Sequence, residues 1–247
     1  MIEAAKDLQD DFFTRLDRYL IADDAELLDV TDHWQTYHLL TENQSLIPSL
    51  PQPHHIARNI NRFGIPGIDI TLPTAEAPLI HQQLAETNGP PLSQEDLENR
   101  RIANGIATWG AELTPGLLPP EARLEARAID YAKGCYTGQE VISRIKMAGK
   151  VNRLLSLFTV EASSGTAPET GDAIVITGEE STKVVGHITS LSPKPTSEGE
   201  RLALGFLKSH HATEHPTTTT FITQPREEGD GNRTSQITLQ PFPKHDS

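Results

Sequence analysis

The residue with the most distinctive chemistry in this sequence is Cys135, the only cysteine among 247 residues. Gly134 and Gly138 flank it, and glycine lets the backbone turn sharply or approach a ligand closely. Lys133 lies two residues before the cysteine, and the apolar spacing after Gly138 predicts a short amphipathic helix. A nearby cation and a helix N-terminus both favour the thiolate, the form that reacts and binds metals. These residues predict a reactive or metal-binding cysteine, and the alternative is a buried, inert cysteine in a glycine turn.

Composition restricts the class of protein. Lys and Arg number 21 against 34 Asp and Glu, and the net charge of −13 argues against nucleic-acid binding as the main role. A single cysteine excludes an internal disulfide and fits a reducing compartment. Apolar runs are shorter than a transmembrane helix, and the N-terminus lacks a signal-peptide pattern. We therefore expect a soluble, cytoplasmic protein without a membrane partner.

The hydrophobic pattern predicts an α+β protein. Helices are expected at 3–22, 78–86 and 93–105, from Pro119 to Ile129, and directly after Gly138. Early strands are expected at 27–31, 37–40, near Ile56 and at 68–72. Later apolar runs between Gly and Pro turns predict a small barrel or sandwich, with strands at 155–160, 173–177, 183–190, 202–206, 221–223 and 236–239. This pattern predicts a first domain over 1–150, a β-barrel domain over 151–240 and a flexible tail over 241–247.

The stretch from Lys133 to Glu140 matches K-G-C-Y-x-G-Q-E, the signature of the YgfZ family. That family comprises folate-binding proteins similar to the T-protein, the aminomethyltransferase of the glycine cleavage system. Residues 16–27, 149–155 and 185–190 resemble three further family stretches, L-x-R-Y-I-I-A-D-D-V-E-L, G-x-V-N-R-x-L and V-G-x-I-T-S. The resemblance implies a T-protein/YgfZ-like folate-binding domain followed by a small antiparallel β-barrel. Family members carry a substantial segment before the first of these stretches, so the folate-binding domain is expected to be N-terminally incomplete.

The resemblance also implies a function: a tetrahydrofolate-binding factor that supports assembly or repair of iron–sulfur proteins. Its expected partners are folate and iron–sulfur assembly proteins or client iron–sulfur enzymes. A cluster takes about four ligands, so Cys135 would share a cluster with a partner or act transiently, and no metal site is expected from this chain alone. Lys133 would favour the thiolate of Cys135. The remaining residues expected to shape the loop or bind folate are Gly134, Tyr136, Gly138, Gln139, Glu140 and Arg144.

A second stretch concerns the pterin ring of folate. Residues 101–106 and 110–112 resemble the family's R-I-E-A-G-I-P…G-x-E. In the T-protein branch the acid of the R-x-E unit is associated with the pterin. A carboxylate can accept two hydrogen bonds at once, one from the pterin amino group and one from a ring N–H. This sequence has Ala103 at that position, and Glu112 is the candidate substitute.

Two alternative functions stay open. The first is a folate-dependent aminomethyltransferase of the glycine cleavage type. The second is a non-catalytic interaction module that has lost folate binding. Whether the chain is an enzyme is also open, and a non-enzymatic or weakly enzymatic factor is the expectation.

Overall fold

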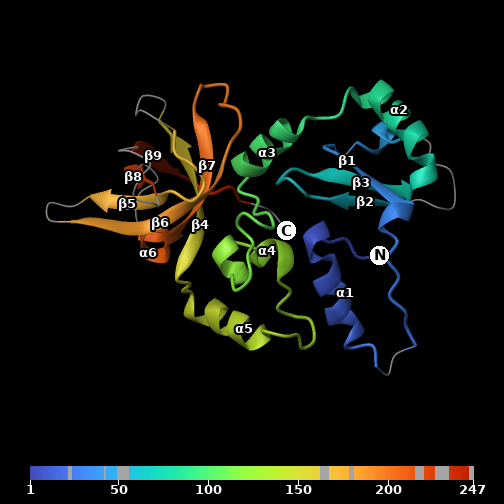
Figure 1. The fold of residues 1–247 in the computed structure, drawn as a ribbon, viewed down its shortest axis with the longest axis horizontal. Helices are drawn as coiled ribbons and strands as arrows, with labels where there is room; N and C mark the ends of the chain where they lie inside the picture. Colours follow the sequence, from blue (N-terminus) through green and yellow to red (C-terminus); the bar gives the residue numbers. More distant parts are fainter. Residues whose placement is uncertain are drawn as a thin grey trace. The chain divides into compact units, whose positions relative to one another are not determined.

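The computed structural model of this chain describes residues 1–21, 24–41, 43–48, 56–161, 167–177, 181–214, 220–225 and 234–244. Its helices and strands form two compact units, Met1–Arg62 with Pro66–Pro91, and Phe63–Ile65 with Leu92–Ser247 (Figure 1). The α-helices are α1 (Gln9–Asp17), α2 (Ala77–Asn88), α3 (Gln94–Ala103), α4 (Glu125–Ala128), α5 (Gln139–Ala148) and α6 (Ser209–Glu214). The strands are β1 (Trp34–Leu39), β2 (Ile56–Ile60), β3 (Gly67–Pro73), β4 (Arg153–Val160), β5 (Ala173–Thr177), β6 (Thr182–Leu191), β7 (Arg201–Lys208), β8 (Thr220–Gln224) and β9 (Ser235–Gln240). This mixture of helix and sheet confirms the α+β class.

The first unit contains a three-stranded antiparallel sheet in the order β1-β3-β2. Alternate residues of a strand point to opposite faces of its sheet. Ile68, Ile70 and Leu72 of β3 therefore share one face, where they are buried with Ile80 of α2. The other face carries polar residues of β1 and β3, including Asp69.

Asp69 is 1% exposed, and basic side chains surround its carboxylate. Arg62 donates to both carboxylate oxygens, with Nη2 at 2.6 Å from Oδ2, and Nδ1 of His38 lies 2.7 Å from Oδ1. Burial alone would raise the pKa of Asp69, but the hydrogen bonds and charges of Arg62 and His38 outweigh it, and the pKa is lowered. The carboxylate is therefore held in its charged form inside the unit.

This lowered pKa predicts an acid-sensitive contribution to stability. A carboxyl whose folded pKa lies below its unfolded value stabilises the fold above that value, and the stabilisation is lost as the pH falls through the folded pKa. We expect Asp69→Asn to lower the free energy of unfolding at pH 7 by about 1.5–3 kcal/mol, the scale of hydrogen bonds to charged groups. The difference between the two proteins should shrink below the ordinary pKa of 3.8. Urea unfolding of both proteins between pH 3 and 7 measures this difference in the free energy of unfolding. A difference that does not change with pH would contradict a lowered pKa for Asp69.

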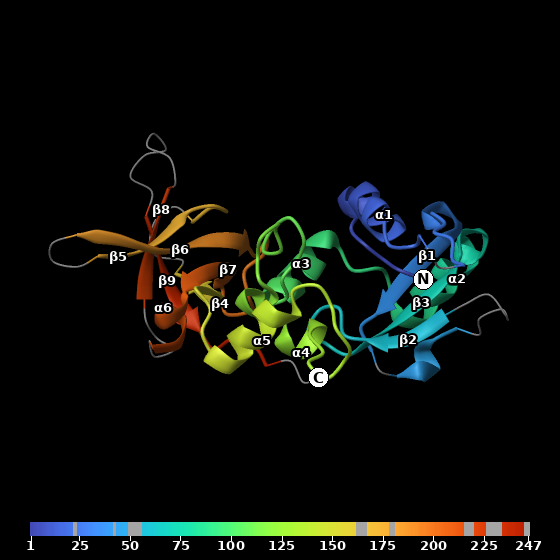
Figure 2. The same ribbon diagram turned by 90° about the horizontal axis from the view of Figure 1, so that it is seen from below.

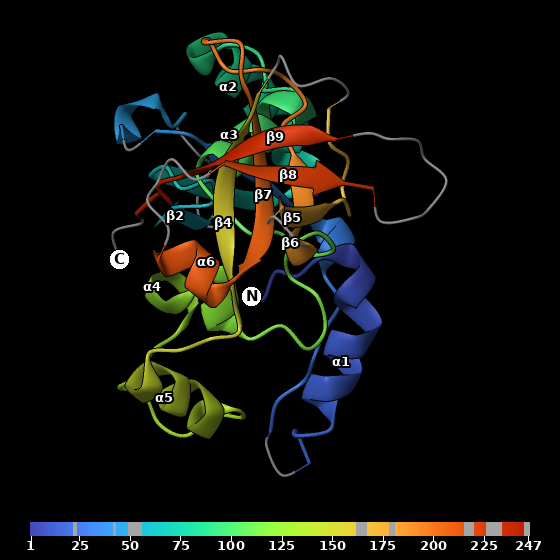
Figure 3. The same ribbon diagram turned by 90° about the vertical axis from the view of Figure 1, so that its left-hand side faces the viewer.

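The second unit contains a closed antiparallel barrel in the order β4-β7-β6-β5-β8-β9 (Figure 2). Its interior is filled by a cluster that includes Phe158, Ile174, Ile188, Leu207 and Phe221. Alternation along β4 places Leu155 and Leu157 in a second cluster, with Ile102 of α3 and two residues of β7. The short helix α6 lies beside β4 and β7 (Figure 3). The predicted barrel is thus confirmed, and α3 is anchored to its outer surface.

Two glycines allow β6 and β7 to approach closely. A Cβ atom at Gly186 would lie 2.1 Å from the carbonyl oxygen of Phe206, and one at Gly205 would lie 2.5 Å from that of His187. Real side-chain atoms do not tolerate such contacts with backbone, so both positions require glycine. The pairing that carries Thr189 and Ser190 therefore depends on these two residues.

Three local predictions were wrong or too broad. Residues 27–31 form no strand, because the side chain of Asp29 accepts hydrogen bonds from the backbone and hydroxyl of Thr31 and favours a turn. The helix expected at 3–22 is α1, which is shorter, preceded by a 3-10 turn; residue 22 lies outside the described residues. The helix expected from Pro119 to Ile129 is divided into a 3-10 turn (Pro119–Ala122) and α4, because Arg123 adopts a left-handed conformation with φ of 57°.

The predicted domain boundary at 150 precedes β4, whereas the compact units divide near residue 91. The boundary at 150 therefore stays a prediction about domain organisation. Within the predicted tail, Phe242 packs against the second cluster, while 245–247 lie outside the described residues. None of the helices among the described residues has both the length and the hydrophobicity needed to cross a bilayer.

Candidate functional site

The first candidate site is the stretch 133–140, called the cysteine loop below, together with helix α5 that follows it. Gly138 begins the helix in a left-handed conformation with φ of 86°, which favours glycine at this position. The amide of Gln139 donates to the carbonyl of Tyr136 at 3.2 Å and tightens the turn. Cys135 is exposed and forms no disulfide. The expectation of a buried cysteine is therefore wrong, and the reactivity of Cys135 stays a prediction.

Two lysines of this region lie over aromatic rings. The ammonium of Lys133 is 4.8 Å from the centroid of the Tyr136 ring, and that of Lys146 is 3.6 Å from the centroid of the Tyr131 ring. Such contacts between a cation and a π-system hold a flexible lysine near a ring. Burial, then the charge of Glu125 and the neighbouring Tyr136, raise the pKa of Tyr131. The lysines and tyrosines thus form a packed surface around the loop.

The hydroxyl of Tyr136 is buried and has no hydrogen-bond partner within the described part of the chain. Buried polar atoms are nearly always paired, so an unpaired phenol next to an exposed cysteine is a position where a bound group or partner would supply the bond. Glu140 and Arg144 pair at 2.6 Å on the surface of α5, with 83% and 68% of their side chains exposed. An exposed pair of this kind adds little stability, so both charges are available to a partner.

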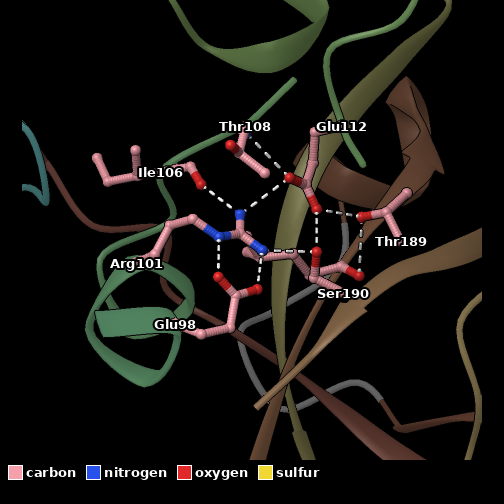
Figure 4. A network of polar contacts seen from close by, with 8 residues as sticks. Glu98, Arg101, Ile106, Thr108, Glu112, Thr189 and Ser190 are labelled. Carbon is pink, nitrogen blue, oxygen red and sulfur yellow. Dashed lines mark hydrogen bonds and ion pairs between the residues drawn. The ribbon is translucent and has the colours of Figure 1, made fainter. Parts of the chain in front are cut away.

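The second candidate site is a buried polar network that joins α3 to β6 (Figure 4). Arg101 lies at its centre with a side chain that is 6% exposed. Its guanidinium donates to both carboxylate oxygens of Glu98, to the carbonyl of Ile106, to Glu112 and to the hydroxyl of Ser190. A guanidinium has five N–H donors, so all five are used.

Glu112 completes this network with a side chain that is fully buried. One carboxylate oxygen accepts from Arg101 at 2.9 Å and from the amide of Thr108 at 3.1 Å. The other accepts from the hydroxyls of Thr189 at 2.7 Å and Ser190 at 2.6 Å. Burial alone would lower the pKa of Arg101, but its bonds to Glu98 and the charge of Glu112 outweigh it and raise the pKa. The Arg101 guanidinium thus stays charged in this buried site.

A β-bulge explains why two successive residues of β6 reach the same carboxylate. Neighbouring residues of a regular strand point to opposite faces. The pairing of β6 with β7 shifts register between Ile188 and Ser190, which re-aims the side chains there. Sequence analysis named Glu112 and the V-G-x-I-T-S stretch but did not connect them. Two adjacent hydroxyls, Thr189 and Ser190, in the strand predicted at 183–190 were the available signal.

The structure keeps the two candidate sites separate. Within the described part of the chain, the hydrogen bonds of Glu112 go to Arg101, Thr108, Thr189 and Ser190 and not to the cysteine loop, and Ala103 is exposed at the end of α3. The carboxylate of Glu112 accepts its hydrogen bonds from Arg101, Thr108 and two residues of β6. The pairing of Lys133 with Tyr136, and of Glu140 with Arg144, brings together four of the residues predicted for the loop.

Comparisons with known proteins relate a little more than half of the chain to curated proteins. No protein-family model matches it. It is 34% identical over 147 residues to the iron–sulfur cluster assembly factor IBA57 homolog, mitochondrial, of Chaetomium globosum, covering 57% of this chain and 30% of that protein. It is 30% identical over 127 residues to the tRNA-modifying protein YgfZ of Pectobacterium carotovorum, covering 51% of this chain and 34% of that protein. The chain spans about a third of the length of the curated relatives it matches.

A solved structure shares the fold. The glycine cleavage system aminomethyltransferase T of Bartonella henselae matches with a TM-score of 0.60 over 78% of this chain and 50% of that one. The identity of 17% establishes a common fold and no more. The fold that the sequence predicted is therefore confirmed.

Proposed function

We propose, from the premise that this chain is a YgfZ-like protein with an aminomethyltransferase-type fold, that it supports assembly or repair of iron–sulfur proteins with Cys135 as its functional thiol. The observation that carries the proposal is the exposed Cys135 within a complete K-G-C-Y-x-G-Q-E loop. A thiol that must reach a cluster on another protein has to be exposed. The unpaired hydroxyl of Tyr136 gives a second reason to place a contact there.

The charge of this region supports the same role. Residues 133–153 carry five basic side chains and one acidic side chain in a protein whose net charge is −13. Clusters held by thiolates are anionic cargo, and a local excess of cations attracts an anionic partner even when the whole protein is acidic. A single cysteine cannot complete a cluster, so the partner, an iron–sulfur assembly protein or client enzyme, would supply the other ligands.

The test is a rescue experiment. The full chain is expressed in cells that lack their own YgfZ-like protein, and the activity of an iron–sulfur enzyme that depends on that protein is measured. We expect activity to return, because the loop and its flanking helix are complete. Normal levels of folded chain without any rescue would overturn the proposal and favour an interaction module.

Tetrahydrofolate is the cofactor that relatedness to YgfZ suggests, and the described residues fit it poorly. The position of the expected acid is occupied by Ala103, whose side chain accepts no hydrogen bonds. Both carboxylate oxygens of Glu112 are engaged, so Glu112 could contact a pterin only by giving up bonds to buried donors. We infer that Glu112 is a structural residue, and no step is assigned to folate.

This inference predicts that a carboxylate at position 103 strengthens folate binding. In Ala103→Glu we expect the affinity for tetrahydrofolate to rise about tenfold, because a carboxylate can accept paired, charge-assisted hydrogen bonds. Calorimetry on the full chain measures it. Ala148→Glu adds the same charge to the exposed end of α5 and is the matched control. An equal gain in both variants, or none in Ala103→Glu, would contradict the assignment of position 103.

The second candidate is an aminomethyltransferase, the activity in the name of a Herpetosiphon aurantiacus protein that is 28% identical to this chain over 146 residues. Formation of methylene-tetrahydrofolate from an aminomethyl donor by the purified chain would support that reaction. We rank it lower because Ala103 replaces the acid and because the loop carries the YgfZ signature.

A further inference from the structure

Helix α1 carries an apolar stripe that the first unit does not bury. Leu8, directly before the helix, is followed at four-residue spacing by Phe12 and Leu16, so the three lie on one face, called the α1 stripe below. No residue of α1 is buried, and Phe12 and Phe13 are 39% and 42% exposed. Further large apolar side chains that are exposed close by in the sequence are Tyr19, Ile21 and Leu28. Exposed apolar residues that gather in this way are typical of an interaction surface.

Polar contacts attach α1 to the first unit without burying this stripe. The side-chain amide of Gln9 donates to the carboxylate of Asp29 at 2.6 Å, and Glu3, ahead of the helix, pairs with Arg62 at 2.6 Å. Helix α1 has nine residues, and helices shorter than about 12–15 residues are marginal in water unless an apolar face is packed. The stripe is therefore the part of α1 where a further contact would stabilise the helix most.

The charges beside the α1 stripe indicate which surface fits it. Asp11 and Arg15 are one helical turn apart and lie on the same edge of the stripe. Within the described part of the chain, neither side chain takes part in a hydrogen bond or an ion pair. Along this edge the negative charge comes first and the positive charge second. A helix that pairs with the edge must present the two charges in the opposite order.

A second copy of α1, running in the antiparallel direction, presents that opposite order. A two-fold axis brings the same edge of each copy together with its sequence reversed. Asp11 of each copy then lies beside Arg15 of the other, while Phe12 faces Phe12 and Leu8 faces Leu16. The dipoles of the two helices also oppose each other, which is favourable. The α1 stripe and its charged edge are therefore complementary to themselves.

We propose that two copies of this chain associate through their α1 stripes in antiparallel orientation. Two short helices form a contact at the small end of protein interfaces, so we expect a reversible dimer with a dissociation constant on the order of 10 μM. The apolar side chains supply most of the affinity, and the two ion pairs between Asp11 and Arg15 fix the direction of the helices. The proposal rests on α1 alone and does not depend on the role of Cys135.

Sedimentation equilibrium of the full chain tests the proposal, at an ionic strength of about 0.15 M, where long-range repulsion between acidic chains is screened. We expect an equilibrium between monomer and dimer over concentrations of about 1–200 μM. Phe12→Ser should weaken association about tenfold, because it removes the ring at the two-fold axis. Asp11→Arg and Arg15→Asp should each weaken it as well, because each places like charges side by side. An equimolar mixture of these two charge variants should associate about as tightly as the unmodified chain, because each new charge meets its opposite.

Asp10→Arg is the matched control. It makes the same change as Asp11→Arg, but Asp10 is exposed two residues before Phe12 and so does not face the α1 stripe. Association of this variant should equal that of the unmodified chain, and equal weakening would assign the effect to net charge and overturn the proposal.

Three further outcomes would overturn the proposal. A chain that is monomeric at every concentration would leave the α1 stripe to a different protein or segment. Dimers that Phe12→Ser leaves unchanged would place the contact elsewhere on the molecule. A mixture of Asp11→Arg and Arg15→Asp that associates no more tightly than either variant alone would exclude the antiparallel pairing. Circular dichroism of each variant checks that the fold persists.

Discussion

Replacement of Glu112 by alanine is expected to lower the free energy of unfolding by about 3–5 kcal/mol, because it removes the fully buried carboxylate that pairs with Arg101 and leaves that charge only the partly exposed Glu98. The same change removes the acceptor of the Thr108 amide and of the Ser190 hydroxyl, and leaves the Thr189 hydroxyl only the carbonyl of Leu204 at 3.2 Å. Each unsatisfied buried donor adds to the loss. The total free energy of unfolding of a small domain is only about 5–15 kcal/mol, so the expected loss is a large fraction of it. Urea unfolding at pH 7 measures the change.

Two further variants keep this prediction testable if Glu112→Ala does not fold. Ser190→Ala removes one hydroxyl from the same network and should cost about 1–3 kcal/mol. Glu140→Ala removes an acid from an exposed pair and should change stability by less than about 1 kcal/mol. If Ser190→Ala and Glu140→Ala had the same small effect, the network would contribute little and the prediction would be wrong.

Replacement of Cys135 by serine is expected to abolish rescue of the iron–sulfur enzyme while leaving the protein folded. Serine keeps the size of the side chain but offers a hydroxyl, which at neutral pH supplies neither a thiolate nor a sulfur ligand. Because Cys135 is exposed, we expect the free energy of unfolding of the Cys135→Ser protein to differ from that of the unmodified chain by less than about 0.5 kcal/mol. The assay is the rescue experiment, with unfolding measured on the purified variant.

Thr137→Ser is the matched control for Cys135→Ser. Thr137 is exposed in the same loop and occupies the one undefined position of K-G-C-Y-x-G-Q-E. Rescue by this variant should equal that of the unmodified chain. Full activity of Cys135→Ser would remove the thiol from the proposal. A loss of activity in both variants would instead indicate that the shape of the loop, and not its sulfur, is what matters.

The sequence predicts most of the elements because their signals are local. The alternating apolar runs after Arg153 correspond to the six strands of the barrel, and the helix expected at 93–105 is α3, which Ser93 caps by accepting a hydrogen bond from the amide of Asp96. The errors are also local in origin. A single left-handed residue, Arg123, interrupts a helix that the apolar spacing favoured, and one side chain, Asp29, replaces a strand by a turn.

The polar network could not be predicted in this way. Arg101 and Ser190 are 89 residues apart in the sequence, and Glu112 and Thr189 are 77 apart. Periodicity within a short window carries no information on such pairs. The cysteine loop is different, because its residues are neighbours in sequence and its signature is complete. Thus the loop could be located from the sequence, whereas the hydrogen-bond partners of Glu112 required the fold.

The network has a consequence for dividing the chain into fragments. The barrel begins at Arg153, but two of its hydroxyls, on Thr189 and Ser190, are bonded to an acid that precedes it. A fragment starting at residue 151 would keep those hydroxyls and lose both Glu112 and Arg101. Phe242 would also lose the surface of Gly105 on which it rests. The barrel is therefore closed as a sheet but is not self-sufficient, and a fragment intended to fold alone should begin before α3.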